Sequence, residues 1–202
     1  MTESLAREFL TFEVAETSLG RGYWLDRPWV DEAQRPALVQ ASILALPHER
    51  GSGPVFPDGS EEFLARLRQI LGSQASLGVA IRSDDYEELA LHSRAWRLPV
   101  LFVTYAALPV MLNILSARLD ELLPGHKTGD TAEITLFVEG ANHKTLKLHY
   151  KGDPKDLGDF FSRSIPRYIG ELDTAPAARH QVDLRARARQ THRNAPVGNS
   201  GN

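Results

Sequence analysis

The stretch from Leu98 to Ala117 carries no charged side chain, and this feature limits the folds open to the chain more than any other. Twenty uncharged residues approach the length of a transmembrane helix. Two prolines and three polar residues interrupt the stretch, and they cancel much of the insertion free energy of its apolar side chains. We therefore favour a buried core segment, and a membrane-associated segment at residues 98–117 is the alternative.

The charge-free stretch divides into two predicted elements. Val100–Tyr105 has the composition of a strand, rich in β-branched and aromatic residues. Pro109 suits the first turn of a helix, because its missing N–H is not needed there. That helix is predicted to run to about Leu123, before Pro124 and Gly125.

Two strands and a helix follow, which completes a β-α-β-β-α order from Leu98 to Ile165. Glu133–Val138 and Thr145–Tyr150 alternate as a hairpin, with Gly140 available for a positive φ in the turn. Asp153 is predicted to cap the last helix, whose first residue is a proline. We expect one shared core, formed by Leu101, Val103, Leu112, Leu115, Phe137, Leu146, Leu157 and Phe161.

The first half of the chain mixes strands and helices as well. Ser60 is predicted to cap a helix with one apolar stripe, which Gly72 ends. We further expect strands at Phe9–Ala15, Pro36–Leu46 (with a helix as alternative) and Leu77–Ile81, a loop at His48–Ser60 and a short helix at Tyr86–His92. The predicted fold class is α/β or α+β, with helices packed on a small mixed sheet.

Charge is unevenly distributed along the chain. Residues 173–202 contain five arginines and two aspartates, so this tail has a net charge of +3 and the remainder carries −6. The tail has few large apolar side chains, which predicts one domain at 1–172 and a disordered basic tail at 173–202. The total of −3 is not that of a nucleic-acid binder, so RNA or acidic lipid would bind only weakly, through the tail.

No pattern typical of catalysis, cofactor binding or metal ligation occurs. The chain lacks cysteine, which excludes disulfides and thiol catalysis. Gly125-His126-Lys127-Thr128 resembles the end of a P-loop, but Asp120 stands where the earlier glycine is needed. The histidine spacing fits no metal motif, and no G-x-S-x-G element exists. We predict no catalytic, cofactor-binding or metal-binding residues, and a hydrolase or transferase without a recognisable motif is the third alternative.

Trp24, Arg27 and Trp29 are the candidate partner-binding residues. They lie in a segment broken by glycine and proline, where side chains are freer to face outward. Tryptophan and arginine are enriched at the energetic centres of protein interfaces. This cluster predicts a protein partner, and an ordinary aromatic corner of the core is the alternative.

Residues 98–165 resemble a known family. The resemblance rests on two segments, VLFVTYAALPVMLNILSARLDELL and AEITLFVEGANHKTLKLHYKGDPKDLGDFF. Their order of apolar helix, strand, glycine-containing hairpin, strand and GDP turn before a helix is similar to that of effector-associated constant components, which are accessory domains of bacterial conflict systems. The resemblance implies a non-enzymatic adaptor or sensor that works beside an effector protein. No catalytic residues come with it.

The leading hypothesis is therefore a non-enzymatic interaction or regulatory domain. The first twenty residues carry several charges and no long apolar run, so no secretory signal is predicted. We expect a cytoplasmic protein, with inner-membrane association as the alternative.

Overall fold

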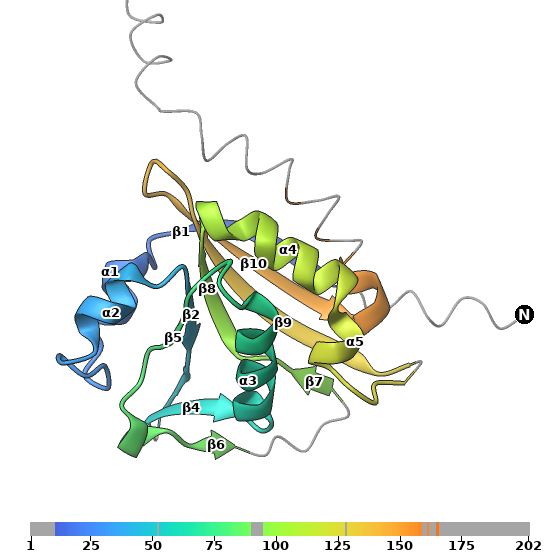
Figure 1. Cartoon of the computed structure of the whole chain (residues 1–202), viewed down its shortest axis with the longest axis horizontal. Helices are drawn as coiled ribbons and strands as arrows, with labels where there is room; N and C mark the ends of the chain where they lie inside the picture. Colours follow the sequence, from blue (N-terminus) through green and yellow to red (C-terminus); the bar gives the residue numbers. More distant parts are fainter. Residues whose placement is uncertain are drawn as a thin grey trace, which may run out of the picture.

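The computed structural model describes residues 11–51, 53–89, 95–127 and 129–158, together with Phe161 and Ile165. These residues form a mixed α/β fold with a seven-stranded main sheet and a three-stranded second sheet (Figure 1). The predicted fold class is thus confirmed. The predicted disordered tail at 173–202 lies outside the described residues.

The main sheet mixes parallel and antiparallel pairs. Its strand order is β1 (Thr11–Thr17), β10 (Thr145–Gly152), β9 (Thr131–Glu139), β8 (Val100–Thr104), β2 (Ile43–Leu46) and β5 (Leu77–Val79), and β7 (Ala95–Arg97) pairs with β9 outside this path. The β2–β5, β8–β9 and β7–β9 pairs are parallel, and the other pairs are antiparallel. β1 and β5 therefore form the two outer edges of this path, and β7, which pairs only with β9 among the described strands, adds a further short edge.

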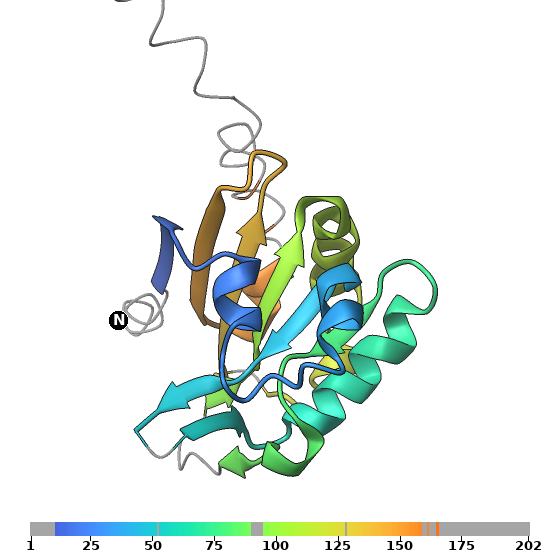
Figure 2. The ribbon, with the colours of Figure 1, turned by 90° about the vertical axis from the view of Figure 1, so that its left-hand side faces the viewer.

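The sheet separates two apolar cores, because successive side chains of a strand point to opposite faces. On β2, Ile43 and Ala45 face the larger core, whereas Leu44 and Leu46 face the smaller one. The helices divide in the same way, as Figures 1 and 2 show. The larger core contains α3 (Ser60–Leu71), α4 (Leu108–Ala117) and α5 (Leu119–Leu122), and the smaller core contains α1 (Arg21–Leu25) and α2 (Arg35–Gln40).

The charge-free stretch contributes to both cores. It forms β8, the 3-10 helix η2 (Tyr105–Ala107) and α4, which buries Leu108, Met111, Ile114 and Leu115. In the part of the chain that the structure describes, every helix is too short or too polar to cross a membrane. The predicted strand and helix are confirmed, although the helix is broken at Arg118 and resumes as α5.

Two members of the predicted core need correction. Leu136 and Val138 of β9 face the larger core, so Phe137 between them faces the smaller one. There its ring lies 5.3 Å from that of Trp24. Leu112 is only partly buried, because it lies at the margin of the α4 face that contacts the sheet. The other members are buried in the larger core as predicted.

The predicted loop at His48–Ser60 is wrong. This segment forms β3 (His48–Arg50) and β4 (Gly53–Pro57), and β6 (Glu88–Leu89) extends them into the second sheet. Its glycines and prolines indicated a loop, but Val55 and Phe56 are buried and fix the strand by packing. The predicted short helix from Tyr86 is also wrong, because η1 (Ser83–Asp85) is followed by β6; His92 lies outside the described residues.

Three local predictions concern residues 36–46, the β9–β10 turn and the cap of the last helix, and the structure confirms them to different degrees. Residues 36–46 form α2 and then β2, so both interpretations of this segment hold in part. In the β9–β10 turn the positive φ falls on His143, at 61°, and not on Gly140. The last helix is described at residues 154–158, and Asp153 caps it as predicted, since its Oδ1 accepts a hydrogen bond from the N–H of Lys155 at 2.9 Å.

Candidate functional site

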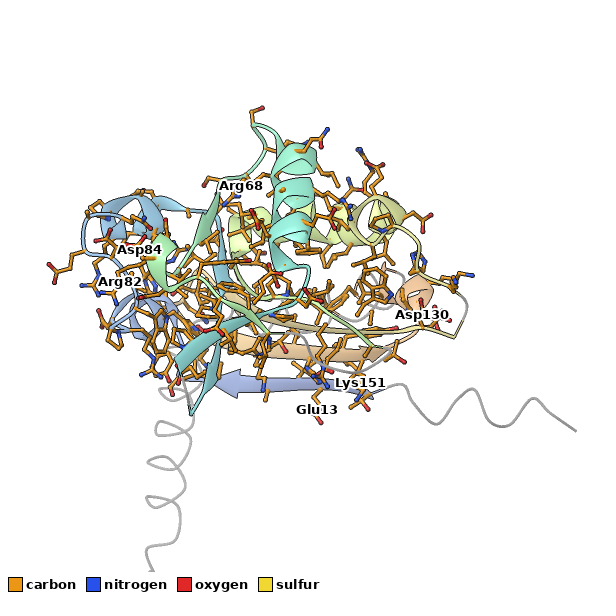
Figure 3. All side chains as sticks on the ribbon, turned by 90° about the horizontal axis from the view of Figure 1, so that it is seen from below. Glu13, Arg68, Arg82, Asp84, Asp130 and Lys151 are labelled. Carbon is orange, nitrogen blue, oxygen red and sulfur yellow. The ribbon has the colours of Figure 1, made fainter. Side chains whose placement is uncertain are left out.

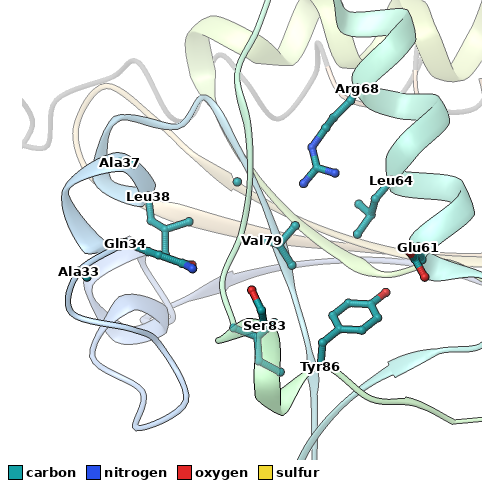
Figure 4. Close-up of a pocket in the computed structure, with 12 residues that line it drawn as sticks. Ala33, Gln34, Ala37, Leu38, Glu61, Leu64, Arg68, Val79, Ser83 and Tyr86 are labelled. Atoms are coloured by element: carbon teal, nitrogen blue, oxygen red, sulfur yellow. The ribbon is translucent and has the colours of Figure 1, made fainter.

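A pocket of about 690 Å³ opens at the β5 edge of the main sheet, between α2 and α3 (Figure 4). Leu38 of α2 and Leu64 of α3 form its two walls, and Val79 of β5 lies on its floor. Ser83 and Tyr86 close one end of it. Its volume falls in the range of about 300–1,000 Å³ that is typical of ligand sites, and its apolar lining with few polar groups is typical as well.

Gly78 explains how α2 comes so close to β5. A Cβ atom at this position would lie 2.7 Å from Cδ2 of Leu38 and 3.2 Å from Cδ2 of Leu44. A side chain at position 78 would force the ends of Leu38 and Leu44 to move, so the glycine lets the Leu38 wall pack directly against the strand. A glycine in this short strand therefore shapes the pocket.

The outer edge of β5 is unpaired among the described residues. Towards β2, the N–H of Ile43 donates to the carbonyl of Ser76 and the N–H of Ala80 donates to the carbonyl of Ala45, both at 2.9 Å. Along a strand, the N–H and C=O groups of successive residues point to opposite sides, so those of Leu77 and Val79 point away from β2. Of these four groups, one has a partner in the described structure: the carbonyl of Val79 accepts from the N–H of Ile81 at 3.0 Å.

The two edges of the main sheet differ in chemistry. β1 carries Glu13 and Glu16, and Figure 3 shows Glu13 projecting outward near Lys151 of β10. Charged side chains on an edge strand discourage pairing with another chain. β5 has the sequence Leu-Gly-Val and carries no charge. It therefore lacks this protection where its edge opens into the pocket.

Arg68 is the cation of the pocket, and Figure 4 shows its guanidinium directed into it. It forms no ion pair with any described carboxylate. All other arginines with described side chains do form one, and they are Arg21, Arg27, Arg35, Arg66, Arg82, Arg97 and Arg118. Within the described part of the chain, the pocket thus offers a guanidinium without an ion-pair partner beside a strand edge that no other strand covers.

Tyr86 and Glu88 fix the end of the pocket that Ser83 and Tyr86 close. The Tyr86 ring stacks on Phe56 with centroids 4.9 Å apart, and its hydroxyl donates to Oε1 of Glu88 at 2.7 Å. Burial raises the pKa of Tyr86, and its hydrogen bond and the negative charge of Glu88 raise it further. The raised pKa therefore keeps the Tyr86 hydroxyl protonated, and its hydrogen bond to Glu88 intact, to a more alkaline pH than an ordinary tyrosine.

The structure separates the three predicted partner-binding residues. Arg27 and Trp29 do come together, because the guanidinium lies 5.5 Å from the Trp29 ring and 4.1 Å from the Tyr23 ring. Arg27 Nε also donates to Oε1 of Glu49 at 2.8 Å. Trp24 does not face outward as expected: it is 8% exposed and fills the smaller core. Arg27, Trp29 and Tyr23 remain as an aromatic surface.

Sequence reasoning identified the strand at Leu77–Ile81 but not the pocket beside it, since neither the neighbours of β5 nor the pairing of Arg68 leaves a local signal.

Among the described residues, no three histidine, aspartate or glutamate side chains are grouped as metal ligands. No protein-family model, curated protein or solved structure matches this chain.

Proposed function

We propose that this chain is an interaction module that binds an extended segment of a protein partner as an added strand along β5. The observation that carries the proposal is the outer edge of β5, which no other described strand pairs with and which lies on the floor of a largely apolar pocket. Backbone N–H and C=O groups require partners once they are buried. In strand addition, main-chain hydrogen bonds provide affinity, and pockets for alternate side chains provide specificity.

The shape of the site favours a single extended segment over a second copy of this chain. An added strand would lie about 4.8 Å beyond β5. The walls of α2 and α3 flank that position on both sides (Figure 4). A second copy would bring its own β5 between the same two helices, so these helices would meet before the two edges could pair.

The proposed partner class agrees with the resemblance of residues 98–165 to accessory components of bacterial conflict systems. In this setting the bound segment belongs to an effector protein, and the module works beside it as a cytoplasmic adaptor or sensor. No step of this proposal requires a catalytic group.

The test is a selection of binding peptides followed by a backbone variant. Random heptapeptides displayed on phage are selected against the full chain, and their affinity is measured by fluorescence polarisation. Val79→Pro removes an N–H that faces the pocket and is not used in the pairing with β2, so the sheet should tolerate it. We expect it to weaken peptide binding by about tenfold or more, because main-chain hydrogen bonds are lost and the proline ring blocks the edge.

Val79→Ala is the matched control, because it shortens the same side chain and keeps the N–H. It should bind the selected peptides within a few-fold of the unmodified chain, and both variants should show cooperative thermal unfolding. Selected peptides that bind Val79→Pro and the unmodified chain equally well would contradict strand addition at β5. A selection that yields no binding peptide would contradict the proposed function altogether.

A further inference from the structure

Arg68 gives the pocket a specificity that a strand edge alone would not have. We propose that the segment bound along β5 carries an aspartate or glutamate side chain that faces Arg68, and a large apolar side chain two residues away that faces Leu64. This inference rests on the proposed function and names the chemistry of the partner segment.

Arg68 has no ion-pair partner in the described part of the chain. Every other arginine with a described side chain has a carboxylate partner within the fold, including Arg66 on the same helix, which pairs with Glu62 at 3.2 Å. Glu61, the carboxylate on the pocket side of α3, is seven residues from Arg68, about 10 Å along the helix. A guanidinium left unpaired beside an apolar wall is suited to bind a carboxylate with two parallel hydrogen bonds.

The spacing of Leu64 and Arg68 along α3 matches the spacing of side chains on one face of a strand. Leu64 and Arg68 lie one helical turn apart on the same wall of the pocket (Figure 4). Four residues of helix rise by about 6 Å. Two residues of strand rise by about 6.6 Å, and side chains two apart face the same side. In an extended segment beside α3, an acidic residue and an apolar residue with one residue between them can therefore face Arg68 and Leu64 at the same time.

The position of Arg68 on the α3 wall distinguishes a side-chain carboxylate from a terminal carboxylate in the bound segment. Arg68 and Leu64 belong to the α3 wall, and the groups of an added strand that face a wall are its side chains. Backbone atoms, including a terminal carboxylate, follow the line of the strand in the plane of the sheet. The wall position of Arg68 therefore favours an internal Asp or Glu.

The test uses synthetic heptapeptides with blocked ends, acetylated and amidated, that carry Glu-x-Leu or Leu-x-Glu at the centre. For each, a partner peptide replaces Glu with Gln. We expect the Glu peptide of one order to bind the full chain about tenfold more tightly than its Gln partner, as a charge-assisted hydrogen bond predicts. The order that binds reveals whether the added strand runs parallel or antiparallel to β5.

Arg68→Gln should remove this preference and leave the binding of the Gln peptide unchanged. Arg66→Gln is the matched control, because Arg66 lies on the same helix outside the pocket and should keep the preference. Arg68→Glu should prefer a peptide with Lys in place of Glu. This reversal would exclude a general loss of structure as the cause.

The outcomes separate this inference from the proposed function. Equal affinities for Glu and Gln peptides, with binding still lost in Val79→Pro, would overturn the role of Arg68 and leave strand addition in place. A preference for Glu that survives in Arg68→Gln would also overturn it, as would binding that requires a free terminal carboxylate. Failure of all peptides, including those selected from the library, would overturn both proposals.

Discussion

The Tyr86 hydroxyl donates a hydrogen bond to Oε1 of Glu88 at 2.7 Å, and this pair joins the wall of the pocket to the first turn of α3. The same carboxylate accepts hydrogen bonds from the N–H of Gly59 at 2.8 Å and of Glu61 at 2.6 Å. Ser60 was the predicted cap, but its hydroxyl donates to the carbonyl of Pro57 at 2.6 Å instead. A side chain distant in sequence therefore replaces the local cap.

Glu88→Gln should lower the free energy of unfolding by about 0.5–1 kcal/mol, because the helix N-terminus loses a negatively charged acceptor. Urea denaturation followed by circular dichroism measures the change. Glu87→Gln is the control, since Glu87 is exposed and its side chain makes no hydrogen bond in the described structure. Equal effects of the two substitutions would contradict the capping role of Glu88.

Alkaline pH should destabilise the fold through two tyrosines. Burial raises the pKa of Tyr86, helped by Glu88, and burial also raises that of Tyr150, helped by Asp156 and Asp153. Both tyrosines have a higher pKa in the folded than in the unfolded chain, so the unfolded chain loses its tyrosine protons first as the pH rises. The free energy of unfolding is therefore unaffected by these two groups below about pH 10, the ordinary tyrosine value, and falls as the pH rises above it. Ultraviolet titration of tyrosine ionisation should show two groups that ionise only as the chain unfolds. Full tyrosine ionisation in the folded protein near pH 10 would contradict this.

The fold was predictable where the signal is local. The stripe of Phe63, Leu64, Leu67 and Leu71 identifies α3, and the alternation of polar and apolar residues identifies most of β9 and β10. β3 and β4 were missed because glycine and proline indicate loops, and β6 was missed because a short helix was predicted at Tyr86–His92. Strand pairing and the burial of Phe56 decide the outcome instead. These contacts connect residues far apart in the sequence, so no local pattern records them.

The candidate site was less predictable for the same reason. The apolar run at Leu77 indicates a strand, but its edge position depends on the order of all strands in the sheet. The orientation of Trp24 follows from α1, which the sequence did not indicate. Successive helical residues point about 100° apart, so Tyr23 faces outward while Trp24 faces the core.

Gly158→Ala should destabilise the chain by about 1–3 kcal/mol or more, because overpacking forces backbone shifts. An added Cβ would lie 2.3 Å from Cα of Ser116, on α4. Gly22→Ala is the matched control, since nothing lies within 4 Å of its added Cβ in α1. Chemical denaturation should show a large loss for the first variant and little or none for the second. A neutral Gly158→Ala would show that the last helix does not contact α4 so closely.

The substitutions Trp24→Ala and Arg27→Ala should lower the free energy of unfolding by different amounts, because Trp24 is a core residue and Arg27 is a surface residue. Trp24 is buried against Phe137, so its truncation should cost about 3–5 kcal/mol. Arg27 lies in a partly exposed cluster with Tyr23 and Glu49, so its truncation should cost about 1 kcal/mol or less. Thermal and urea unfolding measure both. A fully stable Trp24→Ala variant would contradict the assignment of Trp24 to the core.

The central claim is that the outer edge of β5 is open and pairs with a bound peptide. Its most direct test is amide hydrogen exchange along β5, monitored by NMR in the full chain without peptide and then with a selected peptide. In the free protein, the N–H groups of Gly78 and Ala80 should exchange slowly because they face β2, and those of Leu77 and Val79 should exchange fast. Peptide binding should slow Val79 in particular. Slow exchange at Leu77 and Val79 in the free protein would contradict the account, because it would show that the outer edge of β5 is already paired.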